Sequence, residues 1–153
     1  MATLPQLTDL EWKIRRDVYT FWVEHERPPS IDETAGRFGI SPANARTSYQ
    51  RLEEAHQWLL DKDGDQIRMA FPLSAVPTSY RVLVGDQSLW ANCAWDSLGI
   101  PAMLDADAQV EARDPLTEEL VRYEVREGVL RAPQSVVHFA LPVRRWYDDL
   151  VHT

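Results

Sequence analysis

The sequence predicts an α+β fold: a winged-helix-like unit of three helices and a hairpin, then a mixed β-sheet half that carries a cysteine-bearing helix. Two observations lead to this prediction. Helix-capping signals recur three times before residue 57 and are followed by a hairpin pattern. Beyond them, strand-like segments alternate irregularly with helical ones, as α+β folds do. We predict that the winged-helix-like domain spans 1–71 and that the α+β domain spans 72–153.

Three helices are predicted in the first domain from their start signals. The first, 8–25, opens with Thr8 as the cap and Glu11 three residues later, which is the capping-box pattern. The second, 30–38, repeats the same pattern. The third, 41–56, opens with Ser-Pro, and proline suits the first turn of a helix.

A β-hairpin over 58–71 follows the third helix and completes the outline of a winged helix-turn-helix. In the DNA-binding version of that fold the helix 42–56 would enter the major groove and present Arg46, Gln50 and Arg51. The neighbouring residues are acidic, and the formal net charge of the chain is −8. Because phosphate attraction depends on positive charge, DNA is a disfavoured partner.

The composition of the chain excludes several other kinds of protein. The chain has 153 residues, 44% of them hydrophobic, and a single cysteine, so no intramolecular disulfide is possible. Neither an apolar signal peptide nor a long apolar span is present, and we therefore expect a cytoplasmic protein that does not use a membrane. Glycine-rich phosphate loops and the common paired Cys or His motifs are also missing.

The second domain is predicted to contain several strands and two helices. A hairpin over 80–90 turns at Gly85-Asp86. Strands are predicted over 107–113 and 120–126, and the dense apolar run 135–141 is interpreted as a central strand. A last helix is predicted from Pro142 to residue 150.

The chemistry of the chain is concentrated in the stretch 90–101, which holds Cys93 and, three residues later, Asp96. On a helix these two side chains share one face. We expect Gly99 to end that helix, with Pro101 just beyond it. Cys93 would lie in the first turn, where unpaired N–H groups favour a thiolate and hence a nucleophile or a soft-metal ligand. The alternative is that Cys93 is inert packing, as free cysteines often are.

Three segments resemble the alkylmercury (organomercurial) lyases: 71–78, 90–101, and 137–142 together with 145–149. The Asn-Cys-Ala-x-Asp-x-Leu-Gly pattern within 90–101 carries most of the resemblance. It implies protonolysis of a carbon–mercury bond to a hydrocarbon and Hg(II), without an organic cofactor, in an enzyme that packs the winged-helix-like region as part of its structure. Mercury would enter as part of the substrate and would not be a resident metal cofactor.

The resemblance implies that Cys93 is the first mercury-binding cysteine and that Asp96 carries the proton to the leaving carbon and stands beside the metal. Mercury is soft and a thiolate is its preferred protein ligand. The expected partners are a small organomercurial, or another soft-metal ligand, and thiols.

The chain also departs from the family pattern. The resemblance implies a second catalytic cysteine just after the segment that matches 146–153, and the sequence ends there. Two alternatives to the lyase therefore stay open. One is a non-catalytic family member that binds a metal or small ligand through Cys93, and the other, less favoured, is a winged-helix transcriptional regulator.

Overall fold

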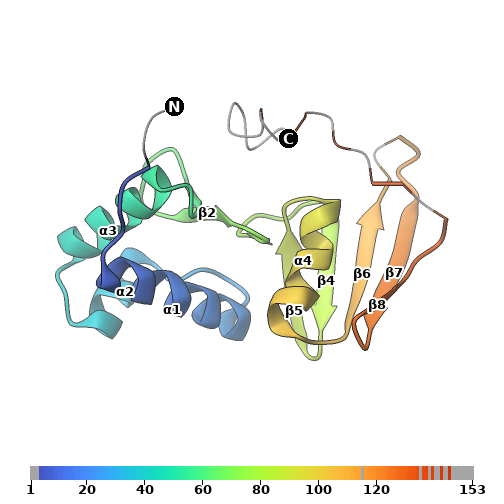
Figure 1. Cartoon of the computed structure of the whole chain (residues 1–153), viewed down its shortest axis with the longest axis horizontal. Coiled ribbons are helices and arrows are strands. Elements are labelled where there is room, and N and C mark those ends of the chain that lie inside the picture. Colours follow the sequence, from blue (N-terminus) through green and yellow to red (C-terminus); the bar gives the residue numbers. More distant parts are fainter. Residues whose placement is uncertain are drawn as a thin grey trace.

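The computed structural model describes residues 4–114, 116–134, 136–137, 139, 142 and 145. Its helices are α1 (Asp9–His25), α2 (Ile31–Phe38), α3 (Pro42–Glu54) and α4 (Ala94–Leu104). Its strands are β1 (Leu59–Leu60), β2 (Ile67–Ala70), β3 (Leu73–Ser74), β4 (Tyr80–Val84), β5 (Gln87–Ala91), β6 (Ala108–Arg113), β7 (Leu120–Arg126) and β8 (Val129–Arg131). Helices α1–α3 gather at one end of the molecule and β6–β8 at the other (Figure 1). The predicted α+β class is confirmed.

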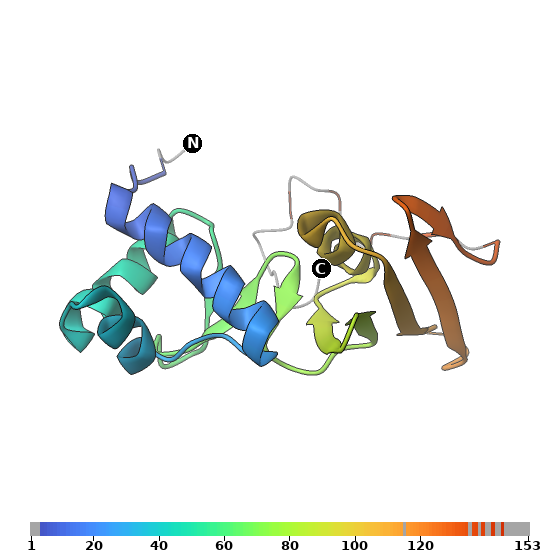
Figure 2. The ribbon, with the colours of Figure 1, turned by 90° about the horizontal axis from the view of Figure 1, so that it is seen from below.

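One eight-stranded sheet runs through the described residues in the order β1-β2-β3-β5-β4-β6-β7-β8. Every pairing in it is antiparallel, so the mixed sheet that we expected is antiparallel in this part of the chain. The short strand β3 joins the N-terminal hairpin to β5, and Figure 2 shows these strands between the helical unit and α4. The sheet thus includes strands on both sides of the boundary predicted between residues 71 and 72. The division into two domains stays a prediction.

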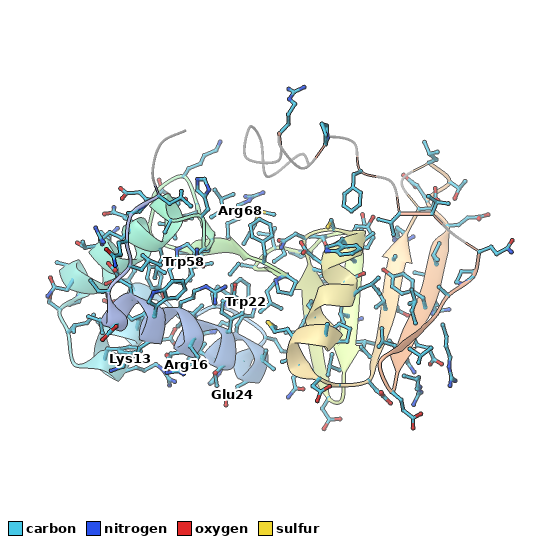
Figure 3. All side chains as sticks on the ribbon, viewed as in Figure 1. Lys13, Arg16, Trp22, Glu24, Trp58 and Arg68 are labelled. Atoms are coloured by element: carbon cyan, nitrogen blue, oxygen red, sulfur yellow. The ribbon has the colours of Figure 1, made fainter. Side chains whose placement is uncertain are left out.

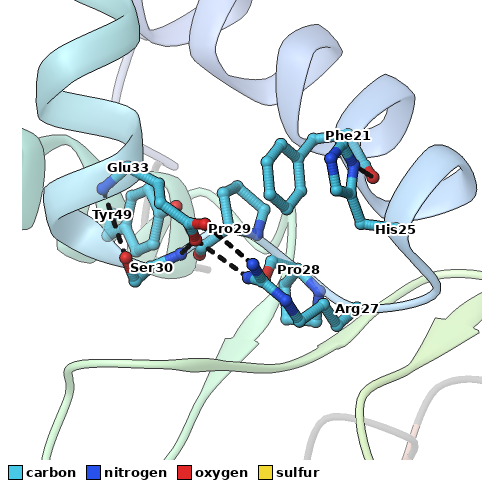
Figure 4. A network of polar contacts seen from close by, with 8 residues as sticks. All are labelled: Phe21, His25, Arg27, Pro28, Pro29, Ser30, Glu33 and Tyr49. Atoms are coloured by element: carbon cyan, nitrogen blue, oxygen red, sulfur yellow. Dashed lines mark hydrogen bonds and ion pairs between the residues drawn. The ribbon is translucent and has the colours of Figure 1, made fainter.

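The three N-terminal helices begin where their caps predict. Thr8 and Ser30 each form a complete capping box with the glutamate three residues on, and Ser41 caps α3. In the α2 box, Glu33 also binds Arg27 through two contacts of 2.8 Å, and these interactions lower its pKa to about 2 (Figure 4). The α3 helix ends at Glu54, two residues earlier than predicted.

Large aromatic side chains fill the core of the helical unit. Trp22 of α1 and Trp58, just before β1, are 1% and 2% exposed, and both point inward in Figure 3. Trp58 donates its indole N–H to the Tyr49 carbonyl at 3.0 Å, and Tyr49 donates to the Pro29 carbonyl at 3.2 Å. The buried polar atoms of Trp58 and Tyr49 are therefore satisfied, and the unit is tied to the first strand of the sheet.

The prediction that Gly99 ends the fourth helix is wrong. Helix α4 continues through Gly99 and Pro101 to Leu104, at the cost of the single backbone bond that Pro101 cannot donate. Gly99 has a packing role instead, because a Cβ at this position would lie 3.1 Å from the Cβ of Pro72. The absence of a side chain lets the helix approach the strand connection closely.

Two predictions at the end of the chain are tested only in part. Of the strand predicted over 135–141, the structure describes Val136, Val137 and Phe139 and assigns none of them to a strand. The rest of that segment lies outside the described residues, and so does the predicted last helix apart from Pro142 and Arg145. No helix among the described residues is long and apolar enough to cross a membrane.

Candidate functional site

Cys93 lies where the chain leaves β5 and enters α4. It is the N-cap residue of α4, with extended backbone angles (φ −149°, ψ 179°), rather than a residue of the first turn as predicted. Its sulfur accepts the backbone N–H of Asp96 at 3.5 Å, as the side chain of a helix cap does. The side chain is partly exposed, so the sulfur is not sealed inside the core.

Asp96 faces Cys93 across the first turn of α4. The two side chains interact electrostatically, and the hydrogen bond between the two residues runs from the Asp96 backbone N–H to the Cys93 sulfur. The side-chain amide of Asn92 reaches Asp96 Oδ2 at 3.2 Å. Sequence reasoning missed Asn92, although its i, i+4 spacing from Asp96 is a detectable signal.

Burial sets the protonation of this pair. It raises the pKa of the Cys93 thiol, and the nearby Asp96 charge adds to the rise, while the backbone N–H of Asp96 opposes it. The backbone N–H groups at the helix terminus lower the pKa of Cys93, as expected, but burial outweighs them, so the net shift of the pKa is upward and opposite to the easier thiolate formation that we expected. Burial also raises the pKa of Asp96, against the hydrogen bonds from Asn92 and Cys93. The resting pair holds a proton on sulfur.

Three tyrosines from different elements interact electrostatically with the pair. Tyr19 of α1 donates its hydroxyl to the Phe71 carbonyl at 2.9 Å, and burial, together with the Asp96 charge, raises its pKa. Burial raises the pKa of Tyr80 from β4 and of Tyr123 from β7, and the Cys93 charge contributes to both. These tyrosines come from distant parts of the sequence, and no local pattern identifies them.

Tyr123 also connects the sheet to the start of α4. Its hydroxyl lies 2.5 Å from the hydroxyl of Ser97, which is fully buried. Ser97 gives its own proton to the Ala94 carbonyl at 2.6 Å, so Tyr123 is the donor in the shared contact. This chain of hydrogen bonds fixes the first turn of α4, and with it the Cys93–Asp96 geometry, against β7.

The described residues contain no cluster of three or more His, Cys, Asp or Glu side chains arranged to hold a metal ion. Cys93 is the one thiol of the sequence, so any second thiolate ligand has to come from outside it. The site can therefore offer a metal one sulfur and the neighbouring carboxylate.

The basic residues predicted to face DNA are occupied within the protein. Arg46 forms an ion pair with Asp65, from the loop of the β1–β2 hairpin. Arg51 binds Glu11 at 2.5 Å and the Gln6 carbonyl at 2.8 Å. Both sets of partners lower the positive charge available to phosphate on this face.

Comparison with known proteins agrees with this arrangement. Residues 73–153 match the family model MerB, described as alkylmercury lyase, which is more than half of the chain. The chain belongs to the alkylmercury lyase family. The match contains Asn92, Cys93 and Asp96, and the resemblance proposed from the sequence is confirmed. No curated protein matches the chain.

A solved structure shares the fold. The crystal structure of the mercury-bound form of MerB2 superposes with a TM-score of 0.66 at 24% sequence identity. The alignment covers 82% of this chain and 60% of the MerB2 chain, so this chain spans about three fifths of the length of that family member. Helices α1–α3 lie outside the family-model match, and the coverage of the MerB2 alignment extends beyond that match.

Proposed function

We propose that this protein is an organomercurial lyase in which Cys93 binds mercury and Asp96 transfers the proton to carbon. The observation that carries this proposal is the pairing of Cys93 with Asp96 at the start of α4, where the Cys93 sulfur accepts the backbone N–H of Asp96 at 3.5 Å and the charge of the Asp96 carboxylate raises the pKa of the thiol. It lies within the residues that match the alkylmercury lyase model. A sulfur ligand and a proton carrier in contact are the two groups that protonolysis of a carbon–mercury bond requires.

In the first step the Asp96 carboxylate takes the proton of the Cys93 thiol. The thiolate then bonds to the mercury of R–Hg–X, and X leaves as an anion. Asp96 is now a carboxylic acid, and its partly buried position stabilises this neutral form.

In the second step Asp96 returns its proton to the carbon that leaves mercury. The electron pair of the carbon–mercury bond becomes the new carbon–hydrogen bond, and the hydrocarbon R–H is released. Mercury(II) stays on Cys93, and Asp96 is again a carboxylate beside it. Mercury enters with the substrate, and the steps call on no resident cofactor.

A thiol from solution would complete the coordination of mercury. Sulfur ligands donate electron density to mercury and weaken its bond to carbon, and two of them do so more than one. With one cysteine in the sequence, turnover in this proposal depends on added thiol, which also removes the Hg(II) product.

The test measures hydrocarbon release from a small organomercurial in excess thiol by wild type and Cys93→Ser. We expect steady release by wild type and only the rate of the thiol solution with Cys93→Ser. Circular dichroism checks that the variant is folded. Equal release by the two proteins contradicts the proposal.

The second candidate function is mercury binding without turnover, and the single cysteine favours it. In that case wild type binds one equivalent of Hg(II), Cys93→Ser binds none, and neither releases hydrocarbon. The same two proteins therefore separate the candidates.

A further inference from the structure

Asn92 is built into the site by three features. Its backbone N–H donates to the Pro72 carbonyl at 3.4 Å, which holds the residue between β5 and α4. Its side-chain amide donates to Asp96 Oδ2 at 3.2 Å. Its Oδ1 atom is buried and accepts no hydrogen bond from the described residues.

The unsatisfied oxygen indicates that the side chain is kept for its contact with Asp96. A buried amide that served packing alone is expected to have partners at both ends, because an unpaired buried carbonyl is costly. Here one end is left unpaired while the N–H end is directed at the carboxylate. This is the orientation that an ionised carboxylate needs, since it accepts hydrogen bonds and donates none.

We propose that Asn92 is a positioning residue that holds the Asp96 carboxylate in the orientation from which it receives the Cys93 proton and delivers it to carbon. This inference rests on the proposed function. With Oδ2 held by Asn92, rotation of the carboxyl group is restrained, and its remaining lone pairs stay available to the thiol. Asn92 is uncharged, so it orients Asp96 without adding a charge beside mercury.

The other groups around Asp96 do not duplicate this contact. The Asp96 charge acts on Tyr19 of α1, but this tyrosine gives its hydroxyl proton to the Phe71 carbonyl. The Arg15 guanidinium lies 4.8 Å over the Tyr19 ring and 3.5 Å from its hydroxyl. Tyr80 and Tyr123 act on the Cys93 side of the pair. Among the described residues, Asn92 is therefore the side chain that donates a hydrogen bond of defined length to the Asp96 carboxylate, next to the thiol that Asp96 deprotonates.

The kinetic test compares Asn92→Ala and Asn92→Leu with wild type; leucine keeps the branching at Cγ and loses the donor. The chain has one other asparagine, Asn44, which is exposed on α3, so Asn44→Ala is the matched control. We expect kcat to fall about tenfold, the effect of losing one hydrogen bond to a charged group. KM and the binding of one Hg(II) per chain stay within twofold. Full kcat in Asn92→Leu, or an equal loss of kcat and mercury binding in both variants, overturns the proposal.

A second measurement does not depend on turnover. With asparagine isotopically labelled, the NMR spectrum has two side-chain amides, one each from Asn44 and Asn92. We expect Asp96→Ala to move the Asn92 amide and leave the Asn44 amide in place. An unmoved Asn92 amide overturns the proposal even if no variant has lyase activity. A shifted amide in a protein without turnover supports the contact and refutes only the proposed function.

Discussion

Replacing Asp96 with asparagine should lower the rate of hydrocarbon release and raise the reactivity of the Cys93 thiol. Under the proposed function the variant loses the proton carrier, so hydrocarbon release falls by about a hundredfold or more. The same change removes a negative charge beside the thiol, and that charge raises the Cys93 pKa in wild type. The pKa of Cys93 should therefore fall, and the thiol should become easier to alkylate at neutral pH.

The size of the shift follows from the partial burial of the pair. Two unit charges about 4 Å apart interact by about 4 kcal/mol at an effective dielectric constant of 20, and solvent at a half-exposed site reduces this. We expect about 1.4 kcal/mol, which is about one pKa unit and a tenfold larger thiolate fraction below the pKa. A less basic thiolate is also roughly threefold less nucleophilic, so the net gain in alkylation rate is about threefold.

The assay is the rate of iodoacetamide alkylation against pH, followed by mass spectrometry. Cys93 is the only cysteine, so every adduct reports on this site. Asp105→Asn is the control. It removes the same charge at an exposed position at the other end of the same helix. The midpoint of the alkylation rate against pH reports the Cys93 pKa. If this midpoint stays in place or rises in Asp96→Asn while Asp105→Asn behaves like wild type, the coupling between Cys93 and Asp96 is refuted.

Two further predictions concern the contacts that hold the site and the helical unit in place. Tyr123→Phe removes the hydrogen-bond donor to buried Ser97 and should lower the free energy of unfolding by about 1 kcal/mol, measured by urea denaturation; an unchanged midpoint would show that the contact stabilises nothing. Burial raises the pKa of Glu11, but hydrogen bonds from Thr8 and Arg51 outweigh it and the net pKa is lowered. Since a lowered pKa stabilises the fold above the unfolded value of 4.5, Glu11→Gln should cost about 2 kcal/mol at pH 7. That difference should shrink as the pH falls below 4.5 through the lower folded-state pKa, and a difference that is constant from pH 7 to pH 3 contradicts the assignment.

The elements with local signals were predictable from the sequence. The capping boxes at Thr8 and Ser30 fixed the starts of α1 and α2, because each cap and its glutamate lie within one turn. The turn of the β4–β5 hairpin at Gly85 was predictable for the same reason, since its positive φ of 57° favours glycine. The spacing of Cys93 and Asp96 likewise predicted that the two residues share one turn, and there the Asp96 backbone N–H reaches the Cys93 sulfur.

The features that the sequence did not reveal depend on contacts between distant segments. Glycine commonly ends a helix, so the sequence suggested that role for Gly99. Its actual role is to allow the close approach of Pro72, which is visible only once the strand connection and the helix are placed together. The sign of the Cys93 pKa shift depended on burial, which the local argument about helix termini omits. Tyr123 was missed because it reaches Ser97 from a strand 26 residues further along the chain.

The contacts between the two halves favour a helical unit that supports the site rather than one that reads DNA. The hairpin that would serve as a wing continues through β3 into the main sheet, so it is not free to enter a groove. Directly beyond it, the Phe71 carbonyl accepts the Tyr19 hydroxyl from α1, and the Pro72 carbonyl accepts the backbone N–H of Asn92. Pro72 also packs against Gly99 of the helix that begins at Cys93. A displacement of α1 would therefore act, through two adjacent residues, on the backbone of Asn92, whose side-chain amide binds Asp96. This gives the N-terminal helices a structural reason to support the candidate site.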